Sequence, residues 1–176
     1  MDETIWMTGG RTDDGTVLQT TEYVTLQTSV RGSDLPEPLL EHCMVQINSN
    51  VIGIFGGLNS QYEDTNKVYF YDLKTGTWTS GPEMFYAKGS VACSKIFIGG
   101  NEYVIVVTRF DESDEYTEIT EFMNIKTLDK WIKGMHFHLV DELFLEIRNW
   151  KVVWVSKFHQ NLSFQVLTFR QKGMKS

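Results

Sequence analysis

Short apolar runs recur along the chain on a period of about 50 residues, and this recurrence constrains the fold more than any other feature. Each run is followed by a glycine pair or by residues that take its place. The copies are Ile5 to Met7 with Gly9-Gly10, Ile52 to Phe55 with Gly56-Gly57, Tyr103 to Val107 with Thr108-Arg109, and Val152 to Val155 with Ser156-Lys157. Self-similarity at such a period predicts a repeat protein in which each copy is one supersecondary unit.

The runs themselves have the length and composition of β-strands. They are rich in Val, Ile, Tyr and Phe and are bounded by Gly, Asn, Asp and Ser, which favours short strands joined by turns. The pattern predicts strands at residues 51–55, 68–71, 103–107, 152–155 and 164–169. Residues 138–148 could also pass for a helix, but we expect their second half to be a strand. The sequence therefore predicts an all-β fold.

Aromatic residues keep their phase within the copies. Tyr71 precedes Trp78 by the same interval as Asn124 precedes Trp131, and Tyr23 precedes Val30 by that interval in the first copy. Aromatic side chains of this size bury about 150–250 Å² each, enough to fill a wedge between neighbouring sheets. Glycine pairs allow positive φ and close backbone approach at a strand end. We therefore interpret one set of residues as structural landmarks: Gly9, Gly10, Gly56, Gly57, Tyr71, Trp78 and Trp131.

An apolar strand ending in Gly-Gly, followed by Tyr and then Trp, resembles the Kelch repeat family. The likeness is strongest in the second copy, while Thr108-Arg109 replaces the glycines in the third. The resemblance implies a β-propeller whose blades are four-stranded antiparallel sheets. We expect one domain over 1–176 with blades at about 1–40, 41–86, 87–135 and 136–176, the last incomplete. These are three and a half to four blades of an incomplete ring, whose unpaired edges favour self-association.

Acidic residues gather in the connections expected between the second and third strands of each copy, at residues 11–20, 58–67 and 110–118. They are Asp13, Asp14, Glu63, Asp64, Asp111, Glu112, Asp114, Glu115 and Glu118. In a propeller these loops emerge on one rim, so residues far apart in sequence become neighbours. Two interpretations stay open: solvated loops without a partner, or an acidic rim that attracts a basic protein surface by electrostatic steering.

Net charge and hydropathy exclude some partners. The formal net charge is -7 and the pI is about 5.1, the wrong sign for binding nucleic acid or anionic lipid over the whole surface. No apolar run approaches the ~18 residues of a membrane span. The first residues carry no basic and apolar signal-peptide pattern. We expect no membrane segment and favour a cytoplasmic location.

The sequence predicts no cofactor and no metal ion. Cys43 and Cys93 are expected to be free thiols at equivalent places on adjacent blades. Residues 111–115 are acidic but lack the glycine and ligand spacing of a calcium loop. His136 and His138 share a strand face, yet no further His or Cys cluster completes a metal site.

Enzyme signatures such as G-x-S-x-G, a P-loop or H-E-x-x-H do not occur. We therefore expect a non-enzymatic module that recognises another protein through loops on one rim. The resemblance implies, as one use, substrate recognition for a cullin ubiquitin ligase. Two alternatives stay open: an enzymatic propeller of the galactose oxidase type with a copper site, and a propeller fragment without activity of its own.

Overall fold

The computed structural model describes residues 5–111, 116–134, 137–138, 146–147 and 150–151. The chain divides into two compact units, Met1–Leu139 and Val140–Ser176. The described residues form strands, turns and loops without any helix, so the all-β prediction is confirmed. In these parts of the chain there is accordingly no helix that could span a membrane.

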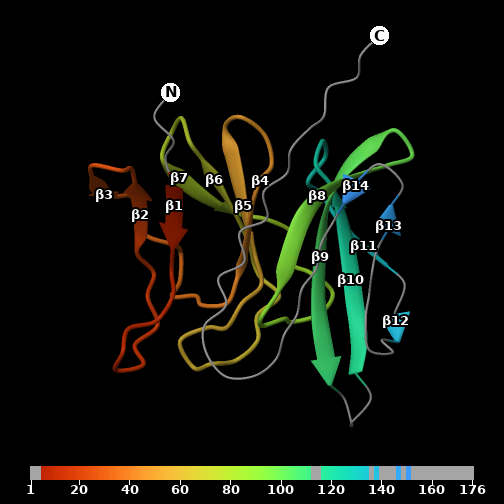
Figure 1. Ribbon diagram of the computed structural model, residues 1–176, viewed down its shortest axis with the longest axis horizontal. Helices are drawn as coiled ribbons and strands as arrows, with labels where there is room; N and C mark the ends of the chain where they lie inside the picture. The colour runs from red at the N-terminus through yellow and green to blue at the C-terminus, as the bar shows by residue number, and fades with distance from the viewer. Residues whose placement is uncertain (1–4, 112–115, 135–136, 139–145, 148–149, 152–176) are drawn as a thin grey trace. The chain divides into compact units, whose positions relative to one another are not determined.

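The first two copies form separate antiparallel sheets (Figure 1). The first sheet has the order β1-β2-β3, with strands β1 (Ile5–Thr8), β2 (Thr21–Val24) and β3 (Ser29–Arg31). The second has the order β4-β5-β6-β7, with strands β4 (Cys43–Gln46), β5 (Val51–Phe55), β6 (Val68–Asp72) and β7 (Thr77–Ser80). The second sheet is thus the four-stranded meander expected of a Kelch-type blade.

The third copy forms a larger sheet, drawn in green and teal in Figure 1. Its order is β11-β10-β9-β8, with strands β8 (Ala92–Ile98), β9 (Asn101–Asp111), β10 (Tyr116–Asn124) and β11 (Trp131–Lys133). A further strand, β12 (Phe137–His138), also pairs with β10.

The second unit holds one short hairpin in its described residues, β13 (Glu146–Ile147) with β14 (Trp150–Lys151). The strand predicted in the second half of residues 138–148 is confirmed for Glu146–Ile147. The strands predicted at 152–155 and 164–169 lie outside the described residues.

The glycine pairs end β1 and β5 by turning the backbone into the left-handed region. The φ angles are 60° and 99° at Gly9 and Gly10, and 59° and 104° at Gly56 and Gly57. A side chain at Gly57 would place its Cβ atom 2.6 Å from the Leu40 carbonyl oxygen. Only glycine fits both the angle and the space, so the chain leaves the sheet here and enters a long loop.

In the third copy Thr108-Arg109 continues the strand. Neither residue has a positive φ, and β9 stays paired with β10 as far as Asp111 opposite Tyr116. The prediction of a loop over residues 110–118 is therefore wrong at both of its ends: Asp111 belongs to β9, and Glu118 belongs to β10. The physical reason is the loss of the glycines, because residues with a Cβ atom strongly disfavour the left-handed turn that would end the strand.

The strand ladders also correct the predicted equivalence of Tyr23 and Tyr71. Ile5 and Ile52 stand at the same distance before their glycine pairs, and they lie opposite Val24 and Tyr71 respectively. Val24 is therefore the counterpart of Tyr71, and Tyr23 lies one residue earlier. A one-residue shift reverses the face to which a side chain points. Tyr23 and Tyr71 consequently face each other from adjacent sheets, with 2.9 Å between their hydroxyl oxygens.

The repeat tryptophans join each sheet to the preceding copy. Trp78 Nε1 donates a hydrogen bond to the Ser33 carbonyl at 3.2 Å, and Trp131 Nε1 donates to the Pro82 carbonyl at 2.8 Å. The ring of Trp131 also packs edge-on against Phe55, with 5.7 Å between ring centroids. These contacts close an apolar core between the second and third sheets, formed by Val45, Ile47, Phe55, Val68, Met84, Val104, Val106, Met123 and Trp131.

Candidate functional site

The loops that follow the two glycine pairs, residues 11–20 and 58–67, lie side by side. The Tyr62 hydroxyl in the second loop donates a hydrogen bond to the Gly15 carbonyl in the first, with 2.5 Å between the oxygens. The loops also share their internal turn: Thr12 N donates to the Thr16 carbonyl and Asn59 N to the Glu63 carbonyl, both at 3.0 Å. The repeat thus brings equivalent loops of neighbouring sheets together.

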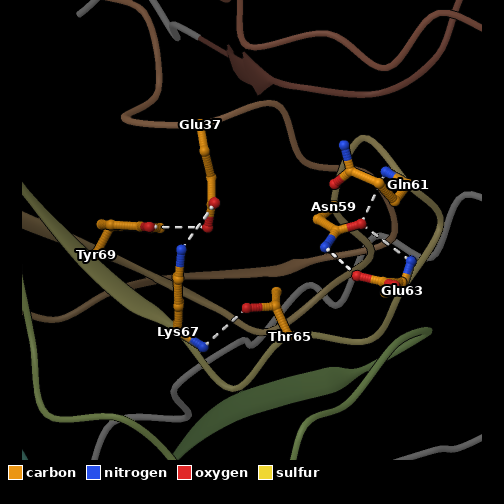
Figure 2. A network of polar contacts seen from close by, with 7 residues as sticks. All are labelled: Glu37, Asn59, Gln61, Glu63, Thr65, Lys67 and Tyr69. Carbon is orange, nitrogen blue, oxygen red and sulfur yellow. Dashed lines mark hydrogen bonds and ion pairs between the residues drawn. The ribbon is translucent and has the colours of Figure 1, made fainter.

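Side chains within the second loop hold its backbone (Figure 2). The Asn59 Oδ1 atom accepts hydrogen bonds from the amides of Gln61 and Glu63 at 2.8 and 3.0 Å. The Asn59 Nδ2 atom in turn donates to Glu63 Oε2 at 3.2 Å. Since an Asn that binds the following amides imitates a backbone turn, the loop has a defined conformation without a partner.

Asp14 stabilises the first loop in a similar way. Its Oδ1 atom accepts hydrogen bonds from the Thr12 hydroxyl and, at 3.1 Å, from the Thr16 amide. The hydrogen bond from the Thr12 side chain, followed by that from the Thr16 backbone, lowers the pKa of Asp14 below its usual value. The exposed carboxylate is therefore charged at neutral pH.

The two loops carry four exposed carboxylates, which we call the acidic loop surface: Asp13, Asp14, Glu63 and Asp64. These four predicted residues are the ones that the structure brings to neighbouring loops. Of the remaining five, Asp111 and Glu118 belong to the β9–β10 hairpin, and Glu112, Asp114 and Glu115 lie outside the described residues.

Glu37, which belongs to no recognisable sequence motif, neutralises the charge of Lys67 at the end of the second loop. Lys67 and Tyr69 both contact the Glu37 carboxylate (Figure 2). Lys67 Nζ lies 3.0 Å from Glu37 Oε2, and the Tyr69 hydroxyl donates to Glu37 Oε1 at 2.8 Å. Burial, and secondarily the bond to Glu37, raises the pKa of Tyr69 above its usual value. Because Lys67 is already paired, it offsets little of the charge of the acidic loop surface.

In the third sheet, a buried ion pair occupies the position that corresponds to Tyr69 in the second sheet. Glu121 takes the place of Tyr69 in its sheet, and its Oε1 atom lies 2.8 Å from Lys88 Nζ with both side chains fully buried. The same carboxylate accepts hydrogen bonds from the amides of Phe85 and Tyr86 at 2.8 and 3.2 Å. Desolvation lowers the pKa of Lys88, although the pairing with Glu121 opposes this effect. The sequence held no signal for this pair, because a Glu in a strand normally points to solvent.

Cys43 and Cys93 form a disulfide that joins β4 to β8, with 5.8 Å between the Cα atoms. The described residues contain no free cysteine, so the prediction of free thiols is wrong. The bond crosses the interface between the second and third sheets, where both side chains pack against the apolar core.

The predicted equivalence of the two cysteines is also wrong. Cys43 lies opposite Phe55 in its ladder, whereas Cys93 lies opposite Val106, the counterpart of Ile54 rather than of Phe55. Successive side chains of a strand point to opposite faces. This one-residue offset is the reason that Cys93 faces back toward Cys43 instead of pointing the same way from its own sheet.

Among the described side chains, His42 is the one histidine. Its Nε2 atom lies 2.7 Å from Thr8 Oγ1, and its buried Nδ1 atom has no hydrogen-bond partner in the described part of the chain. Burial lowers the pKa of His42 to about 4, so the ring is neutral at pH 7.

Metal-binding geometry is not found among the described residues, where no group of three or more His, Cys, Asp or Glu side chains converges. His136 lies outside the described residues, and His138 is placed in β12 by its backbone.

One comparison with known protein families finds a match within the second copy of the repeat. Residues 45–85 match the family model of the Kelch motif, a range that runs from β4 to just beyond β7. The match supports a Kelch repeat in this part of the chain; such repeats build β-propellers and generally mediate protein–protein interactions. No curated protein matches the chain.

Proposed function

We propose that the chain is a non-enzymatic protein-interaction module that binds a basic protein segment through the acidic loop surface. The observation that carries the proposal is the hydrogen bond from Tyr62 to the Gly15 carbonyl, which holds two carboxylate-bearing loops of neighbouring sheets together. The Kelch motif at residues 45–85 supports the general class of function.

The physical argument combines charge and order. Like charges gathered on one surface raise the local potential and accelerate association with a partner of opposite charge. The turns fixed by Asn59 and by Asp14 keep the loops ordered before binding. Binding then costs less conformational entropy than it would for flexible loops.

A lysine-rich peptide is a suitable first probe, because positive charge is the one property that the proposal requires of the partner. We expect its affinity for the wild-type chain to fall as the salt concentration rises. The combined change Asp13→Lys, Glu63→Lys and Asp64→Lys should remove most of the binding and its salt dependence. Reversal of Asp111, Glu112, Asp114 and Glu115 to lysine tests the third copy in the same way.

The matched control reverses three exposed acids elsewhere, Glu22→Lys, Glu102→Lys and Asp129→Lys, and so changes the net charge equally. This control should keep most of the affinity. Equal losses in both variants would mean that net charge alone attracts the peptide, and unchanged binding in both would contradict the proposal.

A role in presenting substrates to a cullin ubiquitin ligase is a finer form of this proposal and rests on the family resemblance alone. Co-purification of a cullin with the protein would support this role, and consistent absence of a cullin from the purified complex would contradict it.

Self-association at β1 is a second proposed contact, because β1 pairs with a single strand in the described residues. In the described part of the chain no strand pairs with β1 on the side where β4 pairs with β5. Ile5 and Met7 are 63% and 54% exposed, whereas their counterparts Ile52 and Ile54 are 8% and 0% exposed. An apolar edge strand without a charged residue favours pairing with another strand.

Native mass spectrometry over a range of concentrations tests this contact. We expect dimers or larger species for the wild-type chain and monomers for Met7→Lys, because a charge on an edge strand opposes pairing. Leu26→Lys, at the most exposed apolar residue, is the control and should associate like the wild type. A wild-type chain that stays monomeric, or a Met7→Lys chain that still associates, would refute the contact.

A further inference from the structure

The first three sheets share two interfaces, and the disulfide lies in one of them, between the second and the third sheet. Met44 is the counterpart of Cys93 in the second sheet, since they lie opposite the corresponding residues Ile54 and Val106. Met44 cannot form such a bond with the first sheet. A covalent link is therefore specific to the interface between β4 and β8 and is not a general feature of the repeat.

That interface is complete without the disulfide. It contains the buried pair of Lys88 and Glu121, the hydrogen bond from Trp131 to the Pro82 carbonyl, and a continuous apolar core. We therefore expect the two sheets to stay packed when the disulfide is reduced, which would keep the cysteines close enough to react again.

Access for a small reagent is also present. Cys43 and Cys93 are both half-buried rather than sealed in the core, and each lies in the first strand of its sheet. Thiols that are partly exposed react with soluble thiols and disulfides, whereas fully buried thiols are inert. Proximity, an intact interface and partial exposure are together the conditions for reversible exchange.

We propose that Cys43 and Cys93 are a reversible oxidation site whose reaction partner is a small-molecule disulfide of the glutathione class. One cysteine thiolate attacks the disulfide of oxidised glutathione, forming a mixed disulfide and releasing one glutathione thiolate. The second cysteine then attacks the protein sulfur of the mixed disulfide and releases the second glutathione. The two protein thiols lose two protons and two electrons in total, and one oxidised glutathione becomes two reduced molecules.

The oxidised state ties β4 to β8 covalently and restricts the separation of the second and third sheets. We expect amide hydrogen exchange in these two strands to slow on oxidation, because opening of the interface then requires more than loss of packing. No disulfide joins the first sheet to the second, so exchange in the first sheet should not change. This inference does not depend on the acidic loop surface, and binding of the lysine-rich peptide is a separate measurement.

The experiment equilibrates the full chain in buffers with different ratios of reduced to oxidised glutathione. Free thiols are then blocked, and the linked peptides that contain Cys43 and Cys93 are quantified by mass spectrometry. We expect the linked fraction to rise from near zero to near complete as oxidised glutathione increases. Cys43→Ser should abolish the link while keeping the fold, as monitored by tryptophan fluorescence.

A relocation variant is the matched control. The pair Ala92→Cys with Cys93→Ala moves the thiol by one residue, to the true counterpart of Cys43, where it points to the other face of β8. This variant should form no intramolecular link at any glutathione ratio. Linkage in the relocation variant, complete absence of linkage in the wild type, or wild-type linkage that persists in excess reduced glutathione would each overturn the proposal.

Discussion

Alanine at Gly57 and at Gly10 should destabilise the chain to different extents, although the two glycines are equivalent in the repeat. Their φ angles are 104° and 99°, so an alanine is strained at either position. This backbone strain costs about 1–3 kcal/mol. The surroundings differ: a Cβ atom at Gly57 would lie 2.6 Å from the Leu40 carbonyl oxygen and 2.8 Å from His42 Cβ, whereas at Gly10 it meets nothing within 4 Å.

Crowding therefore adds a second cost only at Gly57. Overpacking of a closed site costs about 1–3 kcal/mol, so we expect Gly57→Ala to lose about 2 kcal/mol more stability than Gly10→Ala. Denaturant-induced unfolding followed by tryptophan fluorescence measures the difference, because Trp6 and Trp78 lie between the first and second sheets and Trp131 contacts Phe55. Equal losses, or a larger loss for Gly10→Ala, would refute the argument that close backbone approach requires the second glycine of the pair.

Three further predictions concern buried groups. Cys43→Ser should lower the free energy of unfolding by about 4 kcal/mol in non-reducing buffer, since the disulfide spans a sequence separation of 50 residues; the difference from wild type should vanish in excess reductant. Burial lowers the pKa of His42 from the usual 6.5 to about 4 in the folded chain, so between these pH values the unfolded chain binds more protons than the folded chain. The free energy of unfolding should therefore fall by up to about 3 kcal/mol as the pH drops from 6.5 to 4. His42→Gln should remove that part of the pH dependence. Glu121→Gln leaves Lys88 buried without its counter-charge and should lower the free energy of unfolding by about 3–5 kcal/mol, as measured with denaturant. A further Lys88→Met change should recover part of this stability. Full stability of the single variant would show that the pair is dispensable.

The sequence was sufficient for the parts of the fold that depend on local chemistry. Gly56-Gly57 marks the end of β5 because glycine adopts the required angles without strain, and the continuous apolar run Val51 to Phe55 marks the strand that precedes it. The same reasoning located the acidic loops after β1 and β5. It failed after β9, where the loss of both glycines lets Thr108 and Arg109 extend the strand.

Register between strands could not be predicted from the spacing of landmark residues. Tyr23 stands at the interval before Val30 that Tyr71 keeps before Trp78. Its ladder nevertheless pairs Tyr23 with Trp6, one residue away from the position that corresponds to Tyr71, and this offset turns its side chain to the opposite face. The equivalence expected of Cys43 and Cys93 was wrong for the same reason. The pairs formed by Lys67 with Glu37 and by Lys88 with Glu121 join distant segments of the chain, so no local pattern predicts them.

Hydrogen exchange of the full chain, with and without the lysine-rich peptide, is the most direct test of the proposed binding surface. We predict slower exchange on binding in residues 11–20 and 58–67, which form the neighbouring loops, and no change in the turns at 25–28, 73–76 and 126–129 at the other ends of the strands. Protection in those turns, or no protection in either loop, would contradict the assignment of the acidic loop surface as the site of partner binding.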